Sequence, residues 1–234
     1  MSAVVITGAA GDLGRALSAS FLADGHTVFG ADVAATEPCP RLIPVALDVT
    51  DRAAMFALAE RAAEGPGGLS IWINGAGIVR VAKVLEADPE DWQRILAVNL
   101  TGTFYGCAAA LAIMSRQGSG RIVNIGSLSG QVGGTGVHPA YGASKAGVHA
   151  LTKSYALEGA RYGVYCNAVA PSVIEGAMGD QFSERQREVL AQSNPLRRLA
   201  RMDEVVGAIR YLASDAASYT NGVILPVNGG SYLP

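Results

Sequence analysis

A tyrosine and a lysine four residues apart are the side chains in this sequence best suited to chemistry. Tyr141 and Lys145 lie in an alanine-rich stretch with helical periodicity, so they share one face of a helix, one turn apart. An ammonium beside a phenol lowers the pKa of the phenol from about 10 toward the working range of a general base. Ser127 and Asn99 add polar groups suited to proton transfer. Such a Tyr–Lys pair is by itself common and usually structural, so its meaning depends on what surrounds it.

A glycine-rich turn follows the first apolar run. Thr7-Gly8-Ala9-Ala10-Gly11-Asp12-Leu13-Gly14 passes directly into a helical pattern. Glycines let the backbone approach a pyrophosphate, and free amides at a helix N-terminus stabilise its charge, although glycines also serve plain turns. The absence of Gly-Lys-Ser or Gly-Lys-Thr after the turn argues against a mononucleotide loop. We predict that the dinucleotide contacts in this turn come from Gly8, Gly11, Asp12, Leu13 and Gly14.

Acidic and amide residues follow the later apolar runs. Asp32 comes 18 positions after Gly14, where a carboxylate accepts hydrogen bonds from ribose hydroxyls. The uncharged Val33 beside it offers nothing to neutralise a 2′-phosphate, so we expect NAD rather than NADP. Asp48 and Val49 are expected at the adenine. Further cofactor contacts are expected from Asn74 and Ala76.

These residues need a scaffold that brings the ends of several runs together. Short β-branched runs alternate with longer helical stretches along the whole chain, which predicts an α/β fold with one doubly wound parallel sheet of about seven strands flanked by helices. The expected strands are 3–7, 27–31, 42–47, 70–73, 121–125, 164–169 and 222–227. The expected helices are 13–24, 51–63, 89–115, 140–162 and 203–214.

The chain has 234 residues and no linker rich in Pro, Ser or Gly, so we expect one domain over 1–234. The polar segment 176–201 interrupts the alternation and is expected to be an insertion over the substrate site. Since 50% of the residues are hydrophobic and 16% are charged, disorder is excluded.

The charge pattern and the cysteines bound the partners and the compartment. The net charge of −2 gives no broad attraction to nucleic acid or to anionic lipid. The most apolar stretch, 103–114, is shorter than the roughly 20 residues of a membrane-spanning helix, so no membrane insertion is expected. The N-terminus lacks the pattern of a signal peptide, and three scattered cysteines form no metal or redox motif. We therefore expect a cytoplasmic protein with no metal site.

Motifs in a fixed order resemble the short-chain dehydrogenase/reductase family, single-domain branch. They span almost the whole chain and consist of 7–14, Asp48-Val49, Asn74-Gly75-Ala76-Gly77, Asn99, Ser127, Tyr141-Gly142-Ala143-Ser144-Lys145, Asn167-Ala168-Val169-Ala170-Pro171 and Asn228-Gly229-Gly230. The resemblance implies a Rossmann-type sheet and an NAD-dependent oxidoreductase that interconverts a secondary alcohol and a ketone. It also implies a homotetramer. Two alternatives remain: an NADPH-dependent reductase of 3-oxoacyl groups on a carrier protein, and a non-catalytic nucleotide-sensing scaffold.

The resemblance also assigns roles to single residues. It implies that Tyr141 exchanges the hydroxyl proton, that Ser127 holds the substrate oxygen and that Asn99 positions a water. It further implies that Lys145 binds the nicotinamide ribose and lowers the pKa of Tyr141, which also makes both residues cofactor contacts, and that Ile174 contacts the nicotinamide through its backbone. The residues expected to face the substrate are Val79, Arg80, Leu128, Gln131, His138, Val173, Met178 and Phe182, whereas His149 is expected to be a packing residue.

The sequence departs from the family pattern at four places. Asp12 replaces a glycine of the phosphate turn, and we expect it to turn outward as a helix N-cap rather than crowd the pyrophosphate. Ser172 and Gly176 replace a glycine and a threonine, and the family's threonine contacts the nicotinamide carboxamide. The other two departures are Gly75 for an asparagine and Asn228 for an aspartate, the latter expected to concern assembly. The identity of the substrate does not follow from the sequence.

Overall fold

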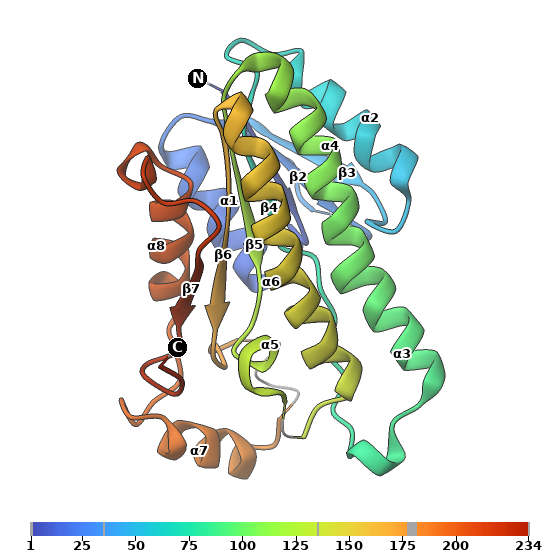
Figure 1. Ribbon diagram of the computed structural model, residues 1–234, viewed down its shortest axis with the longest axis vertical. Coiled ribbons are helices and arrows are strands. Elements are labelled where there is room, and N and C mark those ends of the chain that lie inside the picture. Colours follow the sequence, from blue (N-terminus) through green and yellow to red (C-terminus); the bar gives the residue numbers. More distant parts are fainter. Residues whose placement is uncertain (1, 35, 135, 177–181, 234) are drawn as a thin grey trace.

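The computed structural model describes residues 2–34, 36–134, 136–176 and 182–233. Its centre is a parallel seven-stranded sheet with the strand order β3-β2-β1-β4-β5-β6-β7 (Figure 1). The predicted fold class is confirmed, and each predicted strand lies within two residues of an observed one. The strands are β1 (Ala3–Thr7), β2 (Thr27–Asp32), β3 (Leu42–Ala46), β4 (Leu69–Asn74), β5 (Gly120–Ile125), β6 (Val164–Pro171) and β7 (Ile224–Val227).

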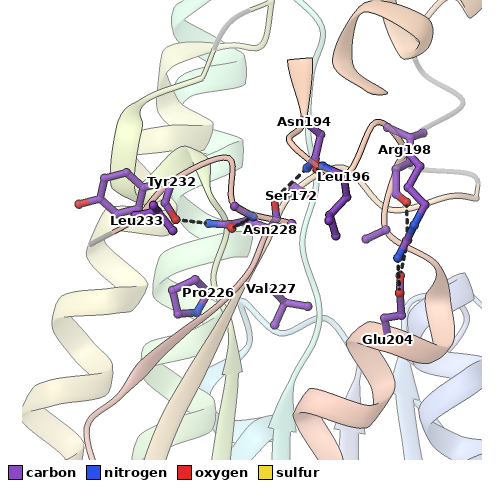
Figure 2. A pocket seen from close by; sticks show the side chains of 14 residues that line it. Ser172, Asn194, Leu196, Arg198, Glu204, Pro226, Val227, Asn228, Tyr232 and Leu233 are labelled. Carbon is purple, nitrogen blue, oxygen red and sulfur yellow. Dashed lines mark hydrogen bonds and ion pairs between the residues drawn. The ribbon is translucent and has the colours of Figure 1, made fainter. Parts of the chain in front are cut away.

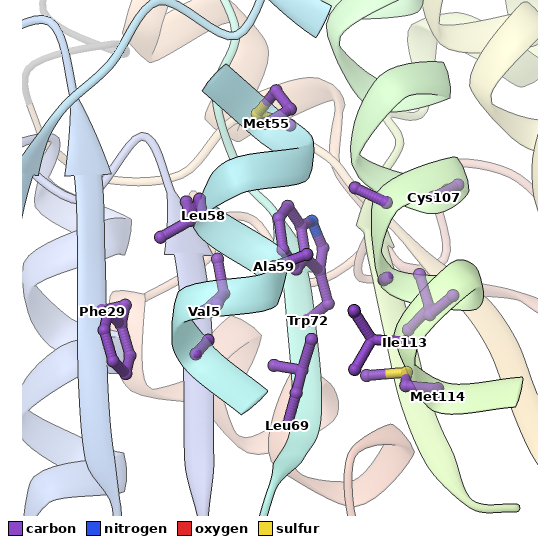
Figure 3. Packing of buried hydrophobic residues seen from close by; sticks show 14 of the residues in the cluster. Val5, Phe29, Met55, Leu58, Ala59, Leu69, Trp72, Cys107, Ile113 and Met114 are labelled. Carbon is purple, nitrogen blue, oxygen red and sulfur yellow. The ribbon is translucent and has the colours of Figure 1, made fainter. Parts of the chain in front are cut away.

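Helices cover both faces of the sheet because successive side chains of each buried strand point to opposite sides. Val4 and Ile6 of β1 pack with the helices α1 (Asp12–Ala23) and α8 (Met202–Leu212). Val5 packs on the other face, where Trp72 lies between side chains of α2 and α4 (Figure 3). The helices of that face are α2 (Arg52–Ala63), α4 (Gly102–Gln117) and α6 (Pro139–Gly159).

The strand order reverses between β1 and β4. From β1 the chain proceeds to β2 and β3 on one side, and from β4 it proceeds to β5, β6 and β7 on the other. In open parallel sheets, ligands bind beyond the carboxyl ends of the strands at such a switch point. The carboxyl ends of β1, β2, β4, β5 and β6 therefore define where the site residues should meet.

The predicted helix 89–115 is longer than expected and contains an irregular turn. It consists of α3 (Pro89–Leu96), the π-helical turn η2 (Ala97–Thr101) and α4. By length and composition alone, Pro89–Gln117 is long and apolar enough to cross a membrane, although its most apolar stretch, 103–114, is shorter than a membrane span. Core helices of globular proteins pass the same test, and Cys107, Ile113 and Met114 are buried against the sheet.

Two helices were not predicted. The short α5 (Ser129–Val132) follows β5, and α7 (Glu184–Ser193) lies inside the segment 176–201. Ser183 and Gln186 cap α7 reciprocally, and this Ser-x-x-Gln spacing is a helix-start signal present in the sequence. The predicted helix 140–162 divides into α6 and the turn η3 (Ala160–Tyr162), and two further turns are η1 (Val84–Glu86) and η5 (Asp215–Ala217).

Candidate active site

The glycine-rich turn forms a close-packed cradle between β1 and α1. Gly8 has a φ of 75°, and a Cβ built on it would lie 2.8 Å from the Cα of Ala76. A Cβ on Gly14 would lie 2.2 Å from the carbonyl oxygen of Gly8. Gly11 is the N-cap of α1 and has no capping side chain. A backbone without side chains at the positive end of a helix fits a pyrophosphate, so these residues suit the dinucleotide that the motif predicts.

Asp12 does not act as the predicted N-cap. Gly11 holds that position with an extended backbone, and Asp12 already belongs to the first turn of α1. The Oδ1 atom of Asp12 lies 2.5 Å from Nη2 of Arg15, and Leu13 is packed against the α1–α8 face of the sheet. The carboxylate therefore stays beside the phosphate turn as half of an ion pair.

Asp32 ends β2 next to the same turn. Its Oδ2 accepts a hydrogen bond from the Ala10 amide at 2.9 Å, and its Oδ1 accepts one from the Ala34 amide at 3.0 Å. Val33 is 74% exposed. Each carboxylate oxygen can accept a second hydrogen bond, so Asp32 is placed where it can also receive ribose hydroxyls.

The two residues expected at the adenine differ in exposure. Asp48 is exposed, and hydrogen bonds from the amide and the hydroxyl of Thr50 lower the pKa of its carboxyl. Val49 is buried and packs where a Cβ on Gly102 of α4 would lie only 2.6 Å from it. Asp48 thus has room for a ligand, whereas the Val49 side chain anchors the loop after β3.

The Asn74 side chain lies in the interior rather than at the cofactor edge. Its Oδ1 accepts a hydrogen bond from the Trp72 indole at 2.8 Å, and its Nδ2 donates to Oδ1 of Asn124 at 2.8 Å. The side chain of Asn74 is thus engaged in the interior, and the predicted nucleotide contact would come from its backbone. The Ala76 amide donates to the Thr7 hydroxyl at 3.2 Å, which ties the loop after β4 to the end of β1.

Tyr141 and Ser127 come together as predicted. Tyr141 lies in the first turn of α6, and Ser127 follows β5. Burial raises the pKa of the Tyr141 phenol, and its hydrogen bond with the Ser127 side chain lowers that pKa by less. Ser127 Oγ also accepts the Ser129 amide at 3.1 Å, which fixes its orientation. A hydroxyl pair of this kind can hold one oxygen atom of a ligand between two donors.

Lys145 lies one turn further along α6. Its Nζ donates a hydrogen bond to the Ile125 carbonyl at 2.7 Å and lies 5.9 Å from the centre of the Tyr141 ring. Burial lowers the pKa of this ammonium to about 8. The predicted lowering of the Tyr141 pKa by Lys145 is therefore wrong for this geometry, because the ammonium faces a carbonyl and the cost of burying a phenolate outweighs it.

Asn99 sits in the π-helical turn and is fully buried. Its Oδ1 accepts the Ile78 amide at 2.8 Å, and its Nδ2 donates to the Ile78 carbonyl at 2.9 Å and to the Ser144 hydroxyl at 3.2 Å. The side chain thus joins the loop after β4 to α6. π-helical turns of this kind are frequent at functional sites.

The expected substrate-facing residues divide into different roles. His138 is buried: its Nδ1 accepts the Ala140 amide as N-cap of α6, and its other ring nitrogen lies 3.0 Å from the Asp88 carbonyl. Arg80 pairs with Asp91 at 3.5 Å. The Gln131 Oε1 atom is buried and has no hydrogen-bond partner among the described residues. Met178 lies outside the described residues.

His149 was expected to be a packing residue, but it also contacts the backbone of Ser127. Its Nε2 accepts the Ser127 amide at 3.5 Å. Burial lowers the pKa of the imidazole to about 4, and Lys145 and Lys153 add to the effect, so the ring is neutral near pH 7. The spacing of eight residues from Tyr141 could have revealed the contact, because it places His149 on the same face of α6.

A hollow of about 400 Å³ lies beside the ends of β6 and β7 (Figure 2). Asn194 Nδ2 donates to the Asn228 carbonyl at 2.8 Å, and Asn228 Nδ2 donates to the Tyr232 carbonyl at 2.9 Å. Arg198 pairs with Glu204 at 2.6 Å. The two asparagines therefore hold the C-terminal tail in place, whereas Arg198 connects the preceding loop to α8. Ile174, the expected nicotinamide contact, bridges to Ala200 nearby.

Known proteins match this chain along nearly its whole length. The family model described as enoyl-(acyl carrier protein) reductase matches residues 8–232. The chain is 40% identical to cis-4-hydroxycyclohexanecarboxylate dehydrogenase of Sinomonas cyclohexanicum, over 97% of this chain and 94% of that protein. It is 36% identical to 3-oxoacyl-(acyl-carrier-protein) reductase of Thermotoga maritima, over 97% of this chain and 96% of that protein. The crystal structure of levodione reductase superposes with a TM-score of 0.90 at 32% identity, covering 98% of this chain and 96% of that one.

Proposed function

Since the chain belongs to the short-chain dehydrogenase/reductase family, and the relatives named above are oxidoreductases of CH–OH or carbonyl groups, we propose that it uses NAD to interconvert a secondary alcohol and a ketone. The observation that carries this proposal is the meeting of Tyr141, Ser127 and Lys145 at the end of β5, on the same carboxyl edge of the sheet as the phosphate turn after β1. Ser127 lies in the loop after β5, whereas Tyr141 and Lys145 lie on α6.

The proton chemistry follows from these side chains. A bound nicotinamide supplies or accepts the hydride, and the protein moves the proton. In ketone reduction Tyr141 donates its hydroxyl proton to the carbonyl oxygen while the Ser127 hydroxyl holds that oxygen. In alcohol oxidation the phenolate form of Tyr141 accepts the proton. The raised pKa of Tyr141 keeps the phenol protonated near neutral pH, which favours its role as the acid.

The preference for NAD rests on Asp32. Its carboxylate is anchored by the Ala10 and Ala34 amides beside the phosphate turn, and the residue after it is Val33. A 2′-phosphate near this carboxylate would meet like charge, whereas a free ribose hydroxyl can donate to it.

The 36% identity to a 3-oxoacyl-(acyl-carrier-protein) reductase supports a second candidate, an NADPH-dependent reductase of carrier-bound 3-oxoacyl groups. Asp32 argues against it. A nucleotide-sensing scaffold without turnover is a further alternative, and the filled positions Asn99, Ser127, Tyr141 and Lys145 argue against that.

A spectrophotometric screen tests these proposals. Purified protein is assayed on secondary alcohols with NAD and NADP, and on ketones and a 3-oxoacyl thioester with NADH and NADPH. The absorbance of the reduced nicotinamide reports turnover in both directions. We expect turnover with a higher kcat/KM for NADH than for NADPH. A preference for NADPH on the thioester would favour the second candidate, and nucleotide binding without any turnover would favour the scaffold.

A cofactor-switch variant tests Asp32 directly. Replacing Asp32 with Ala and Val33 with Arg removes the like charge and adds a guanidinium that pairs with phosphate. The double variant should bind NADPH more tightly than the parent and NADH less tightly, as measured by quenching or enhancement of nucleotide fluorescence. Unchanged preference would show that Asp32 does not face the adenosine ribose.

A further inference from the structure

Two departures from the family pattern, far apart in the sequence, meet in space. A Cβ built on Gly176 would lie 2.8 Å from Oδ2 of Asp12 and 3.5 Å from its Cγ. Real Cβ atoms do not approach other atoms as closely as the shorter distance. The carboxylate of Asp12 therefore fills the volume in which a side chain at position 176 would begin.

The backbone at Gly176 adds a second constraint. Its φ is 120°, a conformation that residues with a Cβ rarely adopt. Asp12 at the start of α1 and glycine at 176 are thus compatible with each other, whereas the threonine of the family pattern at 176 would strain this backbone and displace this carboxylate.

Arg15 holds the other side of the carboxylate. Its Nη2 pairs with Oδ1 of Asp12 at 2.5 Å, and its Nη1 donates to the Ala10 carbonyl. The guanidinium offsets part of the negative charge by pairing with Oδ1, and Oδ2 is the oxygen nearest Gly176. This pairing explains how a carboxylate is tolerated beside a turn built for phosphate.

The contact joins two parts of the cofactor site. Asp12 belongs to the phosphate turn, and Gly176 ends the stretch that follows β6. The Glu175 amide donates to the Ala200 carbonyl at 3.0 Å, which connects that stretch to the far end of the segment 176–201. A shift at Gly176 would therefore move both Ile174 and the residues that precede α8.

We propose that Asp12 and Gly176 form a matched pair that holds the stretch after β6 against the phosphate turn and so positions the bound nucleotide. The inference rests on the proposed nucleotide-dependent function and deepens it. Asp12 and Gly176 act as positioning residues, and the effect of changing one depends on the other.

A double-mutant cycle tests the pair. The variants are Asp12→Ala, Gly176→Ala and the combination, and the readout is the Kd for NADH from nucleotide fluorescence. We expect Asp12→Ala to weaken binding about threefold and Gly176→Ala more than about tenfold, because the added methyl group strains a backbone with a φ of 120° and also displaces the carboxylate. In the Asp12→Ala background Gly176→Ala should cost at least about fivefold less, within the range of couplings between touching residues. If the fold-change in Kd of the double variant equals the product of the fold-changes of the two single variants, the pairing is overturned.

Matched controls separate the pair from general effects. Gly118 has a φ of 73° and open space around a built Cβ, so Gly118→Ala reports backbone strain alone. Asp24 ends α1 and pairs with Arg210 at 2.5 Å, so Asp24→Ala reports the loss of an ion pair on the same helix. Both controls should leave the Kd for NADH within about twofold of the parent, less than 1 kcal/mol.

Thermal unfolding without nucleotide gives a second readout. Asp12→Ala should recover part of the stability that Gly176→Ala loses, and equal loss in both backgrounds, or failure to fold in both, contradicts the pairing. If the parent protein binds neither NADH nor NADPH, the proposed function fails instead, and the stability cycle still decides whether the two residues are coupled.

Discussion

At the scale of single residues, burial acts in opposite directions on Tyr141 and Lys145. It raises the pKa of the phenol and lowers that of the ammonium to about 8, because in each case the charged form loses hydration. Both side chains are thus held closer to neutrality than in water. This suits a site that exchanges one proton with a buried substrate oxygen.

Tyr141→Phe removes only the hydroxyl, so the ring still packs and nucleotide binding should survive. Turnover should fall by about 10² to 10⁴, the usual contribution of a general acid–base group. Steady-state kinetics and NADH fluorescence on the same preparation check this. Lys145→Met should lower both kcat and NADH affinity. A Tyr141→Phe variant that keeps most of its activity would remove Tyr141 from the mechanism.

Lys145 also predicts a pH dependence of stability. Its pKa falls from 10.5 in the unfolded chain to about 8 in the fold, so between these values the unfolded state binds more protons. This contribution to stability is present at high pH and is lost as the pH falls from 10.5 through 8. Lys145→Met should remove a rise of about 2 kcal/mol between pH 7 and pH 10. Urea unfolding of both proteins measures it, and parallel pH profiles would contradict it.

At the scale of elements, α6 carries the site along one face. Tyr141, Lys145 and His149 succeed one another at one-turn spacing, and the contacts of the three reach the end of β5. Built Cβ atoms on Gly126 and Gly130 would lie 2.4 and 2.8 Å from the His149 ring, so both positions leave room for the imidazole. The register of α6 against β5 and α5 therefore sets the geometry of Ser127.

His149→Leu keeps much of the side-chain volume and removes the acceptor for the Ser127 amide. A neutral hydrogen bond contributes about 1 kcal/mol, so we expect kcat to fall between threefold and tenfold, roughly, with little change in the KM for NADH. His149→Gln can supply an amide oxygen and should recover part of the loss. If the His149→Leu and His149→Gln variants show equal changes in kcat, or if only the KM changes, His149 only fills space.

At the scale of the whole molecule, one face of the helical layer remains apolar. A shallow hollow between η2, α4 and α6 is lined by Leu100, Phe104, Ala150 and Leu151, and Phe104 is 43% exposed. The C-terminal tail carries a second apolar side chain, Leu233, at the surface. Two such surfaces fit closed two-fold symmetry with one axis through each.

We therefore predict a homotetramer in which η2, α4 and α6 pack against their copies across one axis and the C-terminal tail packs across another. Phe104→Arg should place a charge in the first interface and reduce the tetramer to a dimer, as measured by light scattering at micromolar concentration. Leu85→Arg, at a fully exposed position of η1, should leave the mass unchanged. A monomeric mass of the parent protein would contradict the prediction.

The sequence by itself determined the strands, their order of appearance and the candidate site residues. Apolar runs of strand length and helical periodicity are local signals, and motifs such as 7–14 or Tyr141 to Lys145 place functional groups at defined ends of those elements. The predicted fold and family followed, because in parallel α/β sheets the ends of the strands converge on one edge whatever the loops do.

Only the tertiary structure decided how each side chain is used. Asn74 turned inward because Trp72 and Asn124 offered buried hydrogen-bond partners, and His149 reached Ser127 because α6 packs tightly on the end of β5. Whether Lys145 lowers the Tyr141 pKa depended on burial and on the Ile125 carbonyl. The meeting of Asp12 and Gly176 likewise depends on how β6 lies relative to α1. These outcomes depend on long-range packing and desolvation, which spacing along a chain does not encode.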